Sequence, residues 1–269
     1  MDRSITLLDG ATGTNLWAMA RQRGLSRAFV GLYNHTRPEL VRELAAQFVA
    51  AGSEIILANT FCANRPTLMN YPGCHVRDMV SAAVALAKEA CGAARVALDV
   101  APLPNPPKDR TDRLGAAEIY DEQIGAGVDA GADLIFLETF WEPTLLTIAA
   151  ERAAQYDLPL FCSMTFGENG ATFAGVTPGE TVQLLEPYHP AAVGLNCSCG
   201  PTDSLPVLRA FRQVTDLPLI YKPNARDHDP GSFVSSMLPA LEIAQYVGGC
   251  CGTTPADIAA LNRAMLALK

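Results

Sequence analysis

The chain has 269 residues, of which 49% are hydrophobic and 18% charged, and its formal net charge is −8. An acidic chain lacks the basic surface that neutralises phosphates, so nucleic acid and anionic membranes are not expected partners. No run of about 18 apolar residues predicts a membrane span, and the first residues do not form a signal peptide, so we expect a cytoplasmic protein.

Eight short apolar runs recur along the chain. Most of these runs are followed by a segment whose apolar residues have helical spacing. Their nearly continuous apolar character is typical of parallel strands buried on both faces. The predicted strands are residues 5–9, 54–59, 95–100, 134–139, 158–166, 192–197, 217–223 and 244–249.

Helices are predicted in most of the intervals between these runs. Pro38, at an early helical position, and Gly52, after the apolar run, mark the bounds of one of them. A Pro-rich stretch at residues 101–112 predicts an irregular loop over one mouth of the fold. The predicted helices are residues 38–52, 80–92, 116–132, 142–155, 179–188, 203–214 and 255–268.

The alternation of strand and helix continues to the end of the chain and indicates the fold class. No long linker interrupts it, so residues 1–269 are predicted to form a single domain. Eight βα units within about 250 residues favour an α/β fold, a single (β/α)8 TIM barrel. An open α/β sheet is the alternative, because strand order is not visible in a sequence.

Polar residues and thiols stand at the carboxyl ends of the predicted strands, where barrel enzymes have their active sites. The pattern therefore predicts that three thiols and two carboxylates meet at one mouth of the barrel. The strand-end residues are Asp9, Asn59, Glu138, Asn196, Cys197, Cys250 and Cys251.

The three cysteines of this group suggest a metal site. Three thiolates suit Zn²⁺ and leave its fourth position open for water or substrate, which is the catalytic arrangement. A substrate thiol bound there would lose its proton at neutral pH and become a nucleophile. Cys197, Cys250 and Cys251 are therefore candidate zinc ligands and act in catalysis through the metal. Two other interpretations stay open: unligated core thiols, or a redox switch formed by the adjacent pair.

Seven motifs carry a resemblance to a known family: LLDGATGTNL, ANTFCAN, FLETF, MTFGENGATFAG, GLNCSCGP, KPNA and GGCCGTTPADI, spread over residues 7–258. The chain resembles the homocysteine S-methyltransferases, which include betaine–homocysteine methyltransferases and the homocysteine domain of cobalamin-dependent methionine synthase. The resemblance implies that Cys197, Cys250 and Cys251 bind zinc and that Cys199 does not.

The same resemblance implies the reaction and the substrate contacts. A methyl group would pass to the thiol of homocysteine and form methionine. Asp9 and Glu138 would meet the homocysteine ammonium, as carboxylates suit a cation in a partly desolvated cleft. Asn59 and Asn196 are expected to shape the pocket by hydrogen bonding to loop backbone.

The motifs leave the methyl donor open among a methylcorrinoid protein, betaine, S-methylmethionine and another sulfonium. GATGT and GLNCSCGP look closest to the methionine synthase branch, which mildly favours a corrinoid carried on a separate protein. Two departures from the family pattern fall in loops expected to face the donor: Ala101–Pro102 replaces Gly-Pro, and Arg226–Asp227 replaces Gly after KPNA. The oligomeric state is not predicted.

Rival functions also remain. Lys222 ends the seventh predicted strand and could form a Schiff base, as in barrel aldolases, if burial lowered its pKa. The Gly-rich turn at residues 248–257 could bind phosphate at a helix N-terminus, although it contains no Lys or Arg. The acceptor could be another small thiol. A zinc-storage or redox-sensing protein would use the cysteines but not Asp9 and Glu138.

Overall fold

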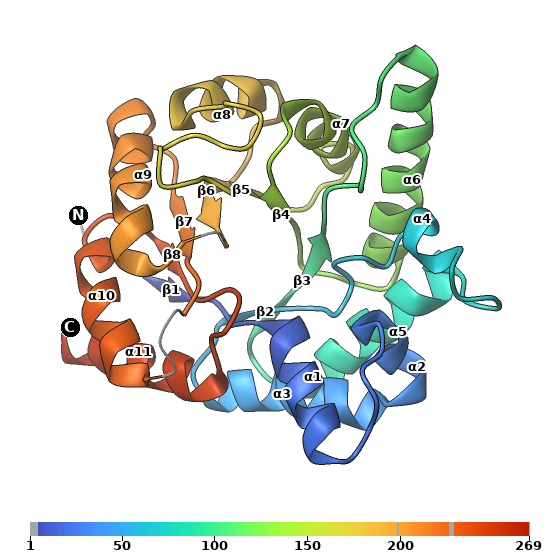
Figure 1. Ribbon diagram of the computed structural model, residues 1–269, viewed down its shortest axis with the longest axis horizontal. Helices are drawn as coiled ribbons and strands as arrows, with labels where there is room; N and C mark the ends of the chain where they lie inside the picture. Colours follow the sequence, from blue (N-terminus) through green and yellow to red (C-terminus); the bar gives the residue numbers. More distant parts are fainter. Residues whose placement is uncertain (1–4, 198, 226–228, 269) are drawn as a thin grey trace.

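The strands form a closed ring in the computed structural model, which describes residues 5–197, 199–225 and 229–268 (Figure 1). Eight strands follow the order β1-β8-β7-β6-β5-β4-β3-β2, and every neighbouring pair is parallel. Leu8 pairs with Ile55 and joins the two ends of the sheet. The predicted TIM barrel is confirmed, and the open-sheet alternative is wrong. The strands are β1 (Thr6–Leu7), β2 (Ile55–Leu57), β3 (Arg95–Val100), β4 (Leu134–Phe140), β5 (Leu160–Met164), β6 (Ala192–Asn196), β7 (Leu219–Lys222) and β8 (Tyr246–Val247).

Helices surround this ring on its outer face (Figure 1). All the predicted helices are present, with shifted bounds. The helices are α1 (Thr12–Gln22), α2 (Tyr33–Thr36), α3 (Pro38–Ala50), α4 (Arg65–Leu68), α5 (Val76–Ala90), α6 (Arg110–Asp129), α7 (Pro143–Ala153), α8 (Pro178–Leu185), α9 (Pro201–Val214), α10 (Pro230–Leu241) and α11 (Pro255–Ala267), with 3-10 turns η1 (Val30–Leu32) and η2 (Glu186–Tyr188).

Several helical features differ from the prediction. Helices α1, α2, α4 and α10 were not predicted: α2 and α4 are only four residues long, α1 begins without a side-chain cap, and α10 contains Pro239. Helix α6 begins inside the segment predicted to be a loop, because the Asp109 side chain caps it by accepting a hydrogen bond from the amide of Asp112 at 2.9 Å. No helix in the described part of the chain is both long and apolar enough to cross a membrane.

The interior of the barrel changes from apolar to polar along the strands. A small apolar cluster that includes Leu134, Phe136 and Phe161 fills its middle, and a larger core lies between the sheet and the helices. Side chains alternate between the two faces of a strand, so residues two positions after an inward-facing one also face inward. The polar layer that follows at the carboxyl ends of the strands consists of Asp99, Glu138, Ser163, Asn196 and Lys222.

Candidate metal and substrate site

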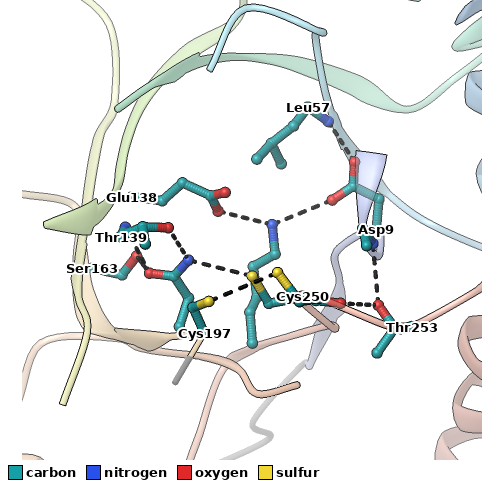
Figure 2. A network of polar contacts seen from close by, with 12 residues as sticks. Asp9, Leu57, Glu138, Thr139, Ser163, Cys197, Cys250 and Thr253 are labelled. Carbon is teal, nitrogen blue, oxygen red and sulfur yellow. Dashed lines mark hydrogen bonds and ion pairs between the residues drawn. The ribbon is translucent and has the colours of Figure 1, made fainter. Parts of the chain in front are cut away.

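Three thiols meet at the carboxyl-end mouth of the barrel, and Figure 2 shows Cys197 and Cys250 there. Cys197 follows β6, while Cys250 and Cys251 follow β8. Their Sγ atoms all lie within 4.8 Å of one another, and those of Cys197 and Cys251 are 3.9 Å apart. Sulfurs about 2.3 Å from a tetrahedral zinc ion would be about 3.8 Å apart, so the thiols fit one metal ion. In the described part of the chain no other group of three or more metal-ligating side chains is this close.

The backbone that carries the thiols is strained and tightly packed. Cys197 has φ 63°, in the left-handed region, and its amide donates to the Lys222 carbonyl at 3.0 Å. Gly249 precedes the adjacent pair, and a Cβ at this position would lie 2.4 Å from Thr253 Oγ1. Thr253 in turn donates to the Cys250 carbonyl at 2.7 Å. The turn therefore holds Cys250 in a fixed position relative to Cys197.

Asn196 connects the thiols to two other strands. Its Oδ1 accepts from the Thr139 amide at 2.8 Å and from Ser163 Oγ at 2.7 Å. Its Nδ2 donates to Thr139 Oγ1 at 2.7 Å and lies 3.8 Å from Cys250 Sγ, which it can also reach as a donor. Asn59 also connects separate segments at this mouth of the barrel: its Nδ2 donates to the Val30 carbonyl at 2.9 Å.

A buried ammonium lies between the two predicted carboxylates. Lys222 Nζ is 3.1 Å from Glu138 Oε2 and 3.4 Å from Asp9 Oδ1. Burial raises the pKa of both carboxyls, and the Lys222 charge opposes that effect. Burial alone would lower the pKa of Lys222, but the charges of Glu138 and Asp9 outweigh it and the pKa is raised. A protonated lysine is not a Schiff-base nucleophile, which argues against the aldolase interpretation.

A cavity of about 400 Å³ opens beside these groups. The three cysteines, Asn59, Glu138 and Lys222 line it, together with the start of α1 and several apolar side chains. The residues that line it do not include Asp9, which instead borders a cavity of about 20 Å³ on the helix side of the strands. The Asp9 carboxylate also accepts from the Leu57 amide at 2.7 Å. Asp9 therefore lies behind the wall of the main cavity.

Asp99 is a site residue that the sequence reasoning missed. It lies on β3, is 4% exposed and lines the main cavity. Burial raises the pKa of its carboxyl well above 3.8, and the negative charge of Glu138 adds to that effect. The available signal was an acidic residue within the apolar run RVALDV.

Other predicted features lie away from the cluster or outside the described residues. Cys199 is buried, with its Sγ 3.9 Å from the Phe166 carbonyl. The turn considered for phosphate leads into α11, where a capping box joins Thr254 and Asp257, so a carboxylate already stands at that helix N-terminus. Arg226–Asp227 lies outside the described residues.

Comparison with known proteins agrees with this arrangement. Residues 6–265 match the family model described as homocysteine S-methyltransferase. The chain belongs to the homocysteine S-methyltransferase family. Methionine synthase of Mycobacterium tuberculosis is 27% identical over 309 residues, an alignment that covers all of this chain and 25% of that protein. This member of the family thus spans about a quarter of the length of the curated relatives it matches.

Solved structures show the same likeness along whole chains. The oxidized form of the homocysteine methyltransferase MmuM from Escherichia coli has 27% sequence identity and a TM-score of 0.84, covering 98% of this chain and 97% of that one. A metallated form of the same enzyme has a TM-score of 0.82 and covers the same shares of the two chains at 24% identity, which supports the fold alone.

Proposed function

We propose that this protein is a zinc-dependent methyltransferase that transfers a methyl group to the thiol of homocysteine and forms methionine. The observation that carries the proposal is the cluster of Cys197, Cys250 and Cys251 at the edge of a cavity that Glu138 also lines. Family membership supports it, as do the activities for which the methionine synthase and MmuM relatives are named.

Zinc is the metal we propose for the cluster, because three thiolates at tetrahedral spacing match its preferences. When bound, it would supply the acceptor sulfur as a thiolate at neutral pH. The protein contributes the position of the ligands, and Asn196 can donate a hydrogen bond to Cys250 Sγ. The apolar walls of the cavity limit water around the reacting groups, and orientation of the acceptor can lower the barrier by about 7–11 kcal/mol in favourable cases.

The substrate contacts also remain proposals. Glu138 lines the cavity and is suited to bind the homocysteine ammonium. Asp9 does not line the cavity, and its contribution is to pair with Lys222, which does. Asn59 and Asn196 shape the wall by their hydrogen bonds to Val30 and Thr139.

The proposal also covers the methyl donor, the cellular location and the domain organisation. The candidate donors are a separate methylcorrinoid protein, betaine, S-methylmethionine and another sulfonium. Cysteine usage supports a cytoplasmic location, because eight cysteines without a disulfide suit a reducing compartment. We propose that residues 1–269 act as one domain.

The test combines metal analysis with product formation. Reduced protein is assayed for zinc and for methionine production from homocysteine, with methylcobalamin, betaine and S-methylmethionine as separate donors. We expect about one zinc per chain, as one three-thiolate cluster requires, and methionine from one of the donors. Protein that holds no zinc when reduced and free of chelator would contradict the proposal.

A further inference from the structure

We propose that Asp99, together with Glu138, binds the α-ammonium of the acceptor amino acid, and that Lys222 keeps Asp9 out of this role. The inference rests on the proposed function and names the group that recognises the acceptor. It assigns specificity to a residue on β3 that the family motifs in this sequence do not include.

The first observation is that the two expected carboxylates already share a cation. Lys222 Nζ lies within 3.4 Å of both Asp9 and Glu138, and all three side chains are buried. The other oxygen of Asp9 accepts from the Leu57 amide. Asp9 therefore has partners on both oxygens and does not line the cavity of the acceptor. Glu138 shares the same cation but lines the cavity, so Glu138, and not Asp9, is placed to meet a substrate ammonium.

The second observation is the position of Asp99. Its Cα pairs with that of Phe136, which faces the barrel interior, and Glu138 stands two residues further along the same strand. Asp99 and Glu138 therefore both point into the mouth, and both line the cavity. Asp99 Oδ1 is buried and has no hydrogen-bond partner among the described residues. A buried carboxylate oxygen without a partner is costly, so a polar ligand is expected to meet it.

The third observation is the balance of charge. Four buried ionisable groups lie at this end of the barrel: the Asp99, Glu138 and Lys222 side chains of the polar layer, and Asp9, which contacts Lys222 from behind the cavity wall. When all are ionised the group has an excess of two negative charges. A ligand ammonium offers three N–H donors and one positive charge, which suits Asp99 and Glu138 together. An amino acid thiol can then direct its sulfur to the cysteines across the same cavity.

The test compares two acceptors that differ only in the amino group. Calorimetry measures the binding of homocysteine and of γ-mercaptobutyrate, the same thiol acid without its ammonium, to the zinc-loaded protein. The variant is Asp99→Asn, which keeps the shape and removes the charge. The matched control is Glu118→Gln on the exposed face of α6, which removes one negative charge outside the cavity.

We expect Asp99→Asn to weaken homocysteine binding about tenfold or more and to leave the binding of γ-mercaptobutyrate unchanged, while Glu118→Gln behaves as the original protein. Unchanged homocysteine binding by Asp99→Asn overturns the inference. An equal loss for both thiols also overturns it, because it indicates a structural role.

Two further outcomes separate this inference from the proposed function. If the original protein binds both thiols equally, the ammonium is not recognised and the inference falls while the thiol site stands. If it binds neither thiol, the proposed function falls as well. Zinc content and a thermal melt show whether Asp99→Asn is folded, and Asp99→Ser replaces it if it is not.

Discussion

The ammonium of Lys222 lies 3.1 Å from the Glu138 carboxylate, and both groups are buried at the mouth of the barrel. Replacement of Lys222 by Met would leave Glu138 and Asp9 without their shared counter-charge. We expect the free energy of unfolding of the metal-free protein to fall by about 3–5 kcal/mol, because one partner of a buried ion pair has been removed. Urea unfolding at neutral pH measures the change.

A partly exposed ion pair provides the control. Lys88 lies 2.7 Å from Asp133, and about a third of each side chain is exposed. Solvent screens such a pair, so Lys88→Met should cost no more than about 1 kcal/mol. If Lys222→Met costs no more than Lys88→Met, the buried pair does not stabilise the mouth of the barrel as described.

The cysteines offer a comparison between a proposed ligand and a buried neighbour. Cys251→Ala removes one of the three clustered thiols and should lose zinc and methyl transfer together. Cys199→Ala removes a buried thiol that is not part of the cluster, and it should keep its zinc. Zinc is measured by atomic emission after dialysis of reduced protein. Full zinc content with activity in Cys251→Ala would rule out this ligand assignment.

The sequence predicted the barrel and the meeting of the thiols because both depend on local patterns. Apolar runs mark the strands, and the carboxyl ends of parallel strands share one edge. It did not predict the ion pair between Lys222 and Asp9. That contact joins residues more than 200 positions apart and depends on how long side chains pack across the mouth. Asp99 was missed because an acidic residue inside a strand has no motif of its own.

Asp99 should make stability depend on pH in a defined direction. Burial raises the pKa of its carboxyl, so between its ordinary value of 3.8 and its folded value the native state binds more protons than the unfolded state. Stability therefore falls as pH rises through that window, and the loss remains at higher pH. Asp99→Asn has no carboxyl to ionise at this position and so avoids this loss of stability. Without ligand, the variant should therefore become more stable relative to the original protein as pH rises.

Urea midpoints measured at about pH 4 and about pH 7 test this expectation, since linked carboxyl titration lies in this range. The difference between Asp99→Asn and the original protein should be larger at the higher pH. Glu118→Gln serves as the exposed control and should follow the original protein at both values. A difference that does not change with pH would show that the Asp99 carboxyl does not titrate differently on folding.

Asn196 provides a test of how the mouth of the barrel positions the three proposed metal ligands. Its amide bonds to Thr139 and Ser163 and can donate to Cys250 Sγ. Asn196→Ala should weaken zinc binding about 10–100-fold, because partners behind the ligands orient them and stabilise the thiolate. Competition with a chromophoric chelator measures the affinity.

Asn262→Ala is the matched control for this variant. Asn262 Nδ2 donates to the Ala51 carbonyl at 3.1 Å, between α11 and the end of α3, and none of these residues lines the main cavity. Its loss should reduce stability by about 1 kcal/mol and leave zinc affinity unchanged. If both variants hold zinc as tightly as the original protein, the thiols are positioned by their own turns alone. The strained backbone at Cys197 would then be sufficient to orient the cluster.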